Sequence, residues 1–235
     1  MSNIYDKYGK EFVDNNLMGP NVIMLAEELC KQLDLHSGMK VLDLGCGKAL
    51  SSIFLAKEYG VTVFATDLWI PASENFERVK AMNLEHLVYP IRAEAHALPY
   101  ADEFFDAIVS FDAYHYFGTD ERYLNDYLIK LVKKGGQIGI AIPGFTHELS
   151  GQELKLRGKY TDDADNLLGF HSKDWWQSFW DRIEAVEGMR TFNLACNREA
   201  WEDWINSPSP IGQEDREFYE NVKELVTVGL IARRS

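Results

Sequence analysis

The 235-residue sequence is poor in several kinds of feature, and each shortage argues against a class of protein. Basic residues number 24 against 37 acidic ones, so the formal net charge is −13. Because affinity for phosphate backbones comes largely from Lys and Arg, we expect no nucleic-acid partner, and the same charge disfavours docking on anionic lipid. No apolar run approaches the roughly 18 residues that a membrane helix needs. We therefore expect neither a nucleic-acid-binding protein nor a membrane protein.

Cysteine is also scarce, with three residues at positions 30, 46 and 196. They are too few and too scattered for a disulfide framework or a Cys-x-x-Cys metal site, and the odd count fits a reducing compartment. The six histidines show no metal-ligand spacing, because Gly151 stands where His147 would need its partner histidine. The first ten residues lack the basic-then-apolar pattern of a secretion signal. We expect a cytoplasmic protein without a metal site.

What the sequence does contain is an alternation of apolar, strand-like runs with helical segments. Repeated alternation of this kind indicates an α/β fold, with a parallel sheet that is covered on both faces. Pro90 cannot donate to a sheet ladder, so its strand is expected at a sheet edge. Strands are predicted over 40–44, 61–66, 87–92, 106–111 and 137–142, and helices over 21–33, 50–59, 72–82 and 121–132.

A single domain with four parts is expected. The parts are N-terminal cap helices over 1–34, a core over 35–142, an insertion and helix over 143–183, and C-terminal strands and helices over 184–235. Residues 144–170 are polar and irregular, which is typical of a surface insertion or a lid. Beyond them we predict a helix over 172–183, a strand over 187–195, helices over 198–205 and 214–223, and a strand over 225–233.

The strongest signal for chemistry is the run VLDLGCGKA over residues 41–49, where a strand meets a helix. Gly45 and Gly47 let the backbone approach a ligand closely, and the helix N-terminus that follows offers unpaired N–H groups. Asp67 follows the next predicted strand, 20 residues after Gly47, where a carboxylate can accept both hydroxyls of a ribose. The pattern predicts a nucleotide-like ligand at the carboxyl edge of the sheet.

Two classes of cofactor compete for this turn. Nicotinamide and flavin folds require Gly-x-Gly-x-x-Gly, but position 50 is Leu. The sequence instead reads Asp-x-Gly-x-Gly-x-Ala, which resembles motif I of class I S-adenosylmethionine (SAM) methyltransferases. Residues 93–110 resemble a stretch of the ubiquinone and menaquinone biosynthesis methyltransferases, and 133–137 (KKGGQ) resemble the turn before their fifth strand. The positions that depart from the usual residues are Ala49, Ala93, Glu94 and Lys134.

The resemblance, which covers about residues 35–142, implies a fold and a cofactor. The fold is a Rossmann-like doubly wound sheet of about seven strands with helices on both faces, the last strand antiparallel, and a lid-like insertion after strand five. The run 225–233 suits an antiparallel strand at the sheet edge. The cofactor is SAM, with S-adenosylhomocysteine (SAH) as the product. The residues implied at the donor are Asp43 near its amino group, Gly45 and Gly47 along its methionyl part, Asp67 at the ribose, Leu68, Glu94 and Ala95 around the adenine, and Ser110 and Phe111 beside the sulfonium.

Residues on the acceptor side are expected in the loop over 112–117, directly after the fourth strand. Transfer from a sulfonium mainly needs in-line positioning, and a base is needed only when the acceptor must lose a proton. His115 is a candidate general base, with packing in the cleft wall as the alternative. Asp112 and Tyr116 are candidates for orienting the acceptor.

The N-terminal segment provides a further candidate. Residues 5–8 and 15–20 resemble the segment that covers the donor in small-molecule methyltransferases, including phosphoethanolamine N-methyltransferases. The resemblance implies that Tyr5 or Tyr8 faces the donor, and ordinary helix packing is the alternative. Together with the 112–117 loop and the 144–170 insertion, this segment is expected to form the acceptor chamber.

These observations predict a SAM-dependent methyltransferase that methylates N or O of a small-molecule acceptor. Two alternatives stay open. One is a non-catalytic SAM- or SAH-binding protein, because the motifs specify cofactor binding and not turnover. The other is a nicotinamide-dependent oxidoreductase of Rossmann type. The sequence does not distinguish a monomer from a homodimer.

Overall fold

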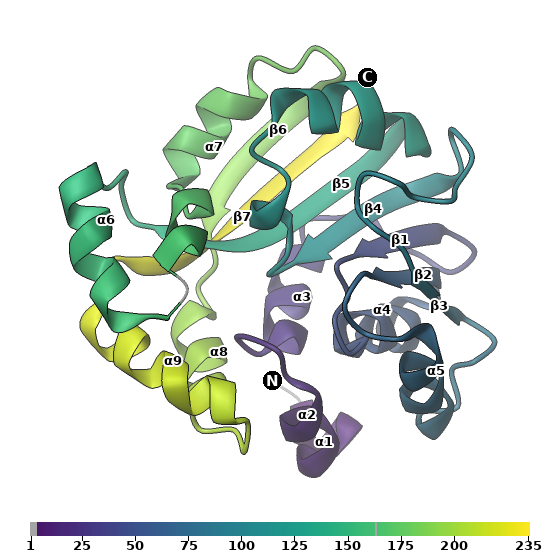
Figure 1. Ribbon diagram of the computed structural model, residues 1–235. Coiled ribbons are helices and arrows are strands. Elements are labelled where there is room, and N and C mark those ends of the chain that lie inside the picture. The colour runs from purple at the N-terminus through teal and green to yellow at the C-terminus, as the bar shows by residue number, and fades with distance from the viewer. Residues whose placement is uncertain (1–3, 163) are drawn as a thin grey trace.

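A seven-stranded sheet runs through the computed structural model, which describes residues 4–162 and 164–235 (Figure 1). Residues 1–3 of the expected N-terminal cap and residue 163 of the expected insertion lie outside this part. The strands are β1 (Lys40–Leu44), β2 (Thr62–Asp67), β3 (Val88–Arg92), β4 (Phe105–Phe111), β5 (Val132–Phe145), β6 (Val186–Asn193) and β7 (Leu225–Arg234). Their order is β3-β2-β1-β4-β5-β7-β6, which confirms the predicted α/β fold class and the seven strands.

Of the seven strands described, β7 is the one that runs opposite to its neighbours. Strands β1 to β5 pair in parallel, while β7 pairs antiparallel with β5 on one side and with β6 on the other. The last strand is therefore antiparallel as predicted, but its expected place at the edge is wrong. Most of β7 is buried, whereas none of the eight residues of β6 is, so β6 is the strand that tolerates an open edge.

The opposite edge is formed by β3, which pairs only with β2 in the described structure. Pro90 lies within this strand and is paired in register with Ala65. A proline has no N–H to donate, so it is tolerated where one side of a strand has no partner. The edge position predicted from Pro90 is confirmed.

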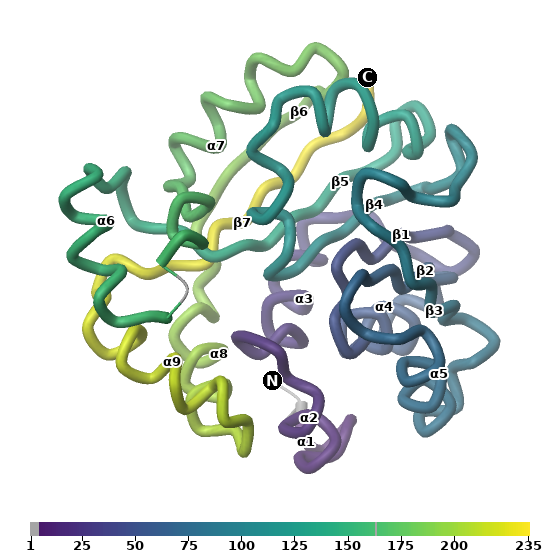
Figure 2. Tube along the Cα trace, viewed as in Figure 1, coloured from purple at the N-terminus to yellow at the C-terminus, as the bar shows by residue number. Residues whose placement is uncertain are grey.

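Helices cover both faces of the sheet (Figure 2). On one face Leu29, Ile53 and Trp204 belong to one buried cluster, and on the other Trp176 and Leu128 belong to a second. Among the described residues no helix is long and apolar enough to span a bilayer. The helices are α1 (Ile4–Tyr8), α2 (Lys10–Asn16), α3 (Val22–Cys30), α4 (Leu50–Tyr59), α5 (Ala72–Ala81), α6 (Gly151–Arg157), α7 (Lys173–Trp180), α8 (Asn197–Ile205) and α9 (Pro210–Asn221).

The helix predicted over 121–132 is not a regular α-helix. It consists of a π-helical turn over Tyr123–Tyr127 followed by a 3₁₀ turn over Leu128–Leu131. The hydroxyl of Tyr123 donates to the carbonyl of Ala95, and the hydroxyl of Tyr127 accepts from the N–H of Leu98. Both tyrosines are thus held by the loop after β3, and these tertiary contacts replace the regular helical geometry that the pattern favoured.

The segment over 144–170 has more order than expected. Strand β5 continues to Phe145, and α6 begins with a capping box in which Ser150 and Glu153 bond each other's backbone N–H. The Arg157 guanidinium then pairs with the carboxylate of Glu224, at 2.6 Å and 3.2 Å. The capping box fixes the start of α6, and the ion pair fastens its end to the residue before β7.

Candidate active site

The turn between β1 and α4 contains three left-handed backbone positions. Gly45 has φ of 73°, Gly47 of 52° and Ala49 of 63°. A Cβ atom added at Gly45 would lie 2.3 Å from the Cβ of Ala113, so the turn touches the loop after β4. Ala49 stands at the third glycine position of the motif and accepts a conformation that costs a non-glycine residue roughly 1–2 kcal/mol. The turn brings the start of α4 to the carboxyl edge of the sheet.

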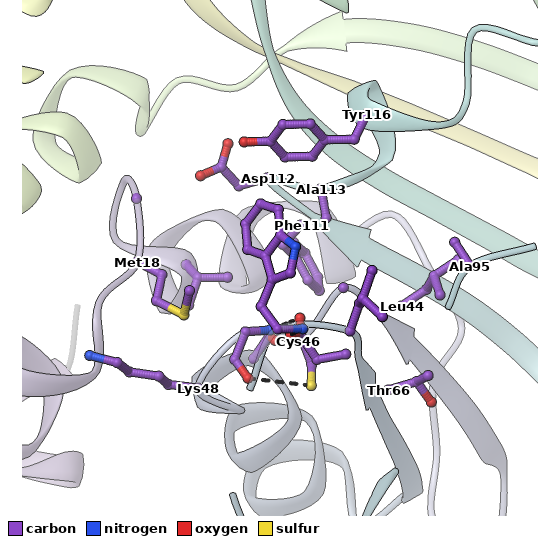
Figure 3. A pocket seen from close by; sticks show the side chains of 18 of the residues that line it. Met18, Leu44, Cys46, Lys48, Thr66, Ala95, Phe111, Asp112, Ala113 and Tyr116 are labelled. Atoms are coloured by element: carbon purple, nitrogen blue, oxygen red, sulfur yellow. Dashed lines mark hydrogen bonds between the residues drawn. The ribbon is translucent and has the colours of Figure 1, made fainter. Parts of the chain in front are cut away.

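A cavity of about 290 Å³ opens at this edge (Figure 3). Small-molecule sites are typically about 300–1,000 Å³. The walls come from the segment between α2 and α3, the β1–α4 turn, the end of β2, and the loops that follow β3 and β4. This is the place where open α/β sheets bind their ligands.

Asp67 ends β2 and lines the cavity, as the spacing predicted. Its Oδ2 accepts from the N–H of Gly47 at 2.8 Å, and its Oδ1 accepts from the N–H of Trp69 and of Ile70 at 2.8 Å and 2.9 Å. A carboxylate has about four lone-pair sites, so about one stays available for a ligand hydroxyl. Asp67 thus ties the motif turn to β2 and still presents an acceptor to the cavity.

Asp43 lies beneath the turn and is not among the cavity-lining residues. Its Oδ2 accepts from the hydroxyls of Ser51 and Ser52, each at 2.6 Å. Burial raises the pKa of Asp43 to about 6, although the two serine hydrogen bonds act in the opposite direction. From this position Asp43 holds the first turn of α4, and the direct contact expected with the donor is not supported.

The wall formed by the ends of β2 and β3 carries the three residues implied at the adenine. Leu68, Glu94 and Ala95 all line the cavity. Glu94 accepts from the N–H of His96 at 2.8 Å, and its second oxygen lies 2.8 Å from the Nδ1 of that ring. The hydrogen bond to His96 lowers the pKa of Glu94. This wall offers apolar surface beside a fixed carboxylate.

Of the two residues at the end of β4 that were expected beside the sulfonium, one lines the cavity and the other does not. Phe111 lines the cavity, but Ser110 is buried and does not. The Ser110 hydroxyl donates to the carbonyl of Leu44 at 2.7 Å, which ties β4 to β1. Ser110 therefore joins two strands of the sheet, and its expected place beside the sulfonium is not supported.

Asp112 follows β4 in a left-handed conformation, with φ of 53°, and lines the cavity. Within the described chain its carboxylate has neither a hydrogen-bond partner nor an ion pair. Desolvation, together with the nearby carboxylate of Asp215, raises the pKa of Asp112 to about 7. The side chains of Asp112 and Tyr116 lie on the same side of the cavity (Figure 3). A carboxyl group that exchanges protons near neutral pH thus faces the site.

His115 is buried, with 5% of its surface exposed, and is not among the cavity-lining residues. Its ring packs 4.1 Å from the ring of Tyr116 and 5.3 Å from that of Phe170, and its Nδ1 has no partner among the described residues. Burial lowers the pKa of His115 to about 3. So weak a base takes no proton from an amine at neutral pH, and the geometry supports the packing alternative over the general base.

Tyr116 and Trp69 form an aromatic pair at the cavity wall. Their ring centroids are 5.6 Å apart at an interplanar angle of 70°. The Tyr116 hydroxyl accepts from the amide of Asn166 at 3.1 Å. This hydrogen bond joins the cavity wall to the 144–170 segment. None of the cavity-lining residues belongs to that segment, so its expected part in the chamber wall is not supported by the described structure.

The N-terminal segment covers the site with residues other than its tyrosines. Tyr8 donates its hydroxyl to Glu58 at 2.8 Å and lies outside the cavity, and Tyr5 donates to Asp203 at 2.6 Å. The expected contact of either tyrosine with the donor is not supported. Met18, between α2 and α3, lines the cavity, and a Cβ at Gly47 would lie 3.0 Å from its sulfur.

Sequence reasoning missed several cavity-lining residues, of which Trp69 is the most prominent. It is the second residue after Asp67, so the strand-end position could have identified it. Met18 had a weaker signal, because the resemblance implies only that residues 15–20 as a whole cover the donor and does not single out one side chain. The missed residues that the structure places in the wall include Met18, Lys48, Thr66, Trp69 and His96.

Residues 41–136 match the protein family described as methyltransferase domain. A phosphoethanolamine N-methyltransferase from Triticum aestivum is 32% identical over 209 residues, covering 83% of this chain and 39% of that protein. A glycine/sarcosine/dimethylglycine N-methyltransferase from Actinopolyspora halophila is 29% identical over 150 residues, covering 63% and 26%. The chain thus spans less than half the length of these curated relatives.

A solved structure of the cyclase SpnF superposes with a TM-score of 0.74 and covers 98% of this chain and 93% of that one at 15% identity, which concerns the fold alone. Fold, turn and cavity together are those of a Rossmann-like protein with a cavity at the carboxyl edge of the sheet. Residues 41–136 match the methyltransferase domain family, and the predicted resemblance to class I SAM-dependent methyltransferases is confirmed.

Proposed function

We propose that this chain binds SAM in the cavity and transfers its methyl group to the nitrogen of a small amine. The proposal rests above all on Asp112, an unpaired carboxylate at the cavity wall whose pKa is raised to about 7. Relatives named as N-methyltransferases of glycine and of phosphoethanolamine add support for nitrogen as the acceptor atom. Nitrogen thus replaces the broader expectation of N or O.

The donor side of the cavity fits SAM. The left-handed turn has no space for a side chain at Gly45 and little at Gly47, so it presents backbone to the cavity that it lines. We assign the ribose hydroxyls to the remaining acceptor site of Asp67, and the adenine to the wall of Leu68, Glu94 and Ala95. When bound, SAM supplies an electrophilic methyl group on a sulfonium that leaves without acid catalysis.

On the acceptor side, Asp112 has two tasks. Its carboxylate attracts an ammonium ion, and the proximity of Asp215 strengthens the negative potential there. Asp112 then takes one proton from the ammonium, which frees the lone pair of the nitrogen. The nitrogen forms a bond to the methyl carbon while the carbon–sulfur bond breaks and its electron pair stays on sulfur. The product is a methylated ammonium and SAH, and Asp112 later gives its proton to solvent.

Positioning completes the mechanism. Phe111 and Ala113 flank the Asp112 backbone and line the cavity, while Trp69 and Tyr116 present aromatic faces that stabilise a cationic ammonium. Holding nitrogen, methyl and sulfur in line can supply roughly 7–11 kcal/mol of the barrier reduction. Asn166 fixes the Tyr116 hydroxyl and so acts as a positioning residue.

A turnover assay tests the proposal. The full chain is incubated with SAM and with matched amines and phenols, and SAH release is measured together with SAH affinity by calorimetry. We expect SAH to bind and amines to be methylated. SAH binding with no turnover on any acceptor would favour the non-catalytic alternative, and methylation of phenols alone would contradict the assignment to nitrogen.

The cellular setting belongs to the same proposal. Cys30, Cys46 and Cys196 are free thiols, which supports a reducing cytoplasm as the compartment. We propose a small-molecule partner on the strength of the cavity size.

A further inference from the structure

Large apolar side chains are exposed around the mouth of the cavity. Met18, Leu68, Trp69 and Tyr116 all line it, and between 41% and 62% of each residue is exposed. Leu168, which is 67% exposed, lies two residues from the Asn166 that bonds Tyr116. Large exposed apolar side chains gathered at one cavity are typical of a ligand-binding site.

Positive charge is scarce in the cavity wall. Within the described chain its lining includes one lysine, Lys48, and no arginine. The Lys48 ammonium donates to the backbone carbonyl of Asn15 at 3.0 Å. In Figure 3 the Lys48 side chain lies at the lower left, whereas Tyr116 lies at the top. A carboxylate or phosphate in this cavity would therefore find one lysine or arginine in the described wall, and that lysine already donates to a backbone carbonyl.

The remaining groups near the mouth are also unsuited to an anion. His96 is held by Glu94, and Asp112 is flanked by a second carboxylate, Asp215. An anionic tail placed there would be repelled, because like charges in a partly desolvated site cost free energy. The apolar rim and the negative wall favour the same kind of ligand.

Building on the proposed function, we infer that the acceptor is an amine with an apolar or aromatic body and no anionic group. Its ammonium lies at Asp112, and its body lies against Trp69 and Tyr116 and extends over the apolar rim. The nitrogen gives one proton to Asp112 and its lone pair to the methyl carbon, and the electron pair of the broken carbon–sulfur bond stays on sulfur. This acceptor differs in chemistry from the glycine and phosphoethanolamine that give the relatives their names.

The first experiment compares acceptors that differ by one group. Phenethylamine and phenylalanine differ by a carboxylate, and methylamine, glycine and phosphoethanolamine complete the panel. SAH and N-methylated product are measured with the full chain at saturating SAM. We expect kcat/KM for phenethylamine to exceed that for phenylalanine, glycine and phosphoethanolamine by about tenfold or more.

The outcomes separate this inference from the proposed function. Preference for phenylalanine, glycine or phosphoethanolamine would overturn the apolar acceptor and leave N-methylation standing. Methylation of no amine in the panel, with SAH bound, would overturn both.

A second experiment asks whether Trp69 contacts the acceptor body. In Trp69→Ala we expect kcat/KM for phenethylamine to fall about tenfold more than that for methylamine, because only the larger acceptor reaches the ring. Equal losses for both acceptors would show a structural effect and overturn the contact. Ile211→Ala is the matched control, because Ile211 is 61% exposed on α9, lies outside the cavity wall, and should leave both values unchanged.

Discussion

The donor and acceptor halves of the cavity are built in different ways. The donor half depends on backbone conformation within short stretches of sequence: the β1–α4 turn and the ends of β2 and β3. The acceptor half depends on side chains from distant segments, since Trp69, Asp112 and Tyr116 line the cavity together. Asn166, from yet another segment, donates to the Tyr116 hydroxyl. Short stretches of sequence can therefore determine the cofactor half, whereas the acceptor half forms only when distant segments have folded together.

The largest effect is expected from Gly45→Val, which tests the dependence of the donor half on backbone. A side chain there would collide with Ala113 and force a left-handed position on a β-branched residue. We expect SAH binding to fall below detection in calorimetry and the melting temperature to drop.

Gly135→Val provides the matched control. Gly135 has the same φ of 73°, but a Cβ there would meet nothing within 4 Å. Both variants share the backbone strain and differ in the collision. Normal SAH affinity in Gly45→Val would contradict the close approach of this turn to the cofactor.

Next in size is Asp112→Asn, which tests the acceptor half. Loss of a general base typically costs about 10²- to 10⁴-fold in rate. We expect kcat to fall in this range while SAH affinity changes by less than about threefold. In the unmodified chain kcat/KM should rise with pH through about 7, since Asp112 must be ionised to accept a proton, and this limb should vanish in the variant.

His115→Asn is the companion to that variant, because His115 lies three residues further along the same loop. Its pKa is lowered to about 3 and its ring lies outside the cavity wall. We expect its loss of kcat to be at least about tenfold smaller than that of Asp112→Asn. The reverse order would restore His115 as the base.

A smaller effect is expected from Asp67→Ala. The substitution removes the acceptor for three backbone N–H groups and for the donor ribose. Hydrogen bonds to a charged group contribute roughly 1.5–3 kcal/mol, so we expect SAH affinity to weaken about 10- to 150-fold. Asp102→Ala, at an exposed loop position outside the cavity, should bind SAH normally. Unchanged affinity in Asp67→Ala would remove this carboxylate from the donor site.

The smallest effect concerns stability and pH. The pKa of Asp112 is about 7 in the folded chain and about 3.9 when unfolded, so between these values the folded state binds the extra proton. Stability contributed by this group is therefore lost as pH rises from about 4 to about 7. Asp112→Asn removes this charge, so thermal unfolding should show a higher melting temperature for the variant at pH 8 and no difference at pH 4. A lower melting temperature at pH 8 would contradict the unpaired burial of the carboxylate.

The parts of the site that the sequence made predictable are those set by local chemistry. Gly45, Gly47 and Asp67 stand at strand ends, where the chain path is determined by residues a few positions away. The edge position of β3 was predictable for a similar reason, because Pro90 lacks a donor. The helix start at α6 was also readable, since Ser150 and Glu153 form a capping box, but the polar composition favoured an irregular segment.

The parts that could not be predicted depend on tertiary packing. His115 and Tyr116 are neighbours in a 3₁₀ turn, but Tyr116 lines the cavity whereas the His115 ring packs against Phe170, far along the chain. The raised pKa of Asp112 depends on burial and on Asp215, which lies about a hundred residues further along the chain. Neither the position of the His115 ring nor the pKa of Asp112 could be predicted from the residues near them in the sequence.

The central claim, methyl transfer from SAM to an amine nitrogen, is tested most directly by following a labelled methyl group. The full chain is given SAM with a ¹³C-labelled methyl group and phenethylamine, and the product is examined by NMR while SAH is measured. The account predicts that the label appears on nitrogen, that SAH and N-methylated amine form in equal amounts, and that Asp112→Asn forms both far more slowly. A label on oxygen or carbon of a competing acceptor, or SAH formation no faster than without the protein, would contradict it.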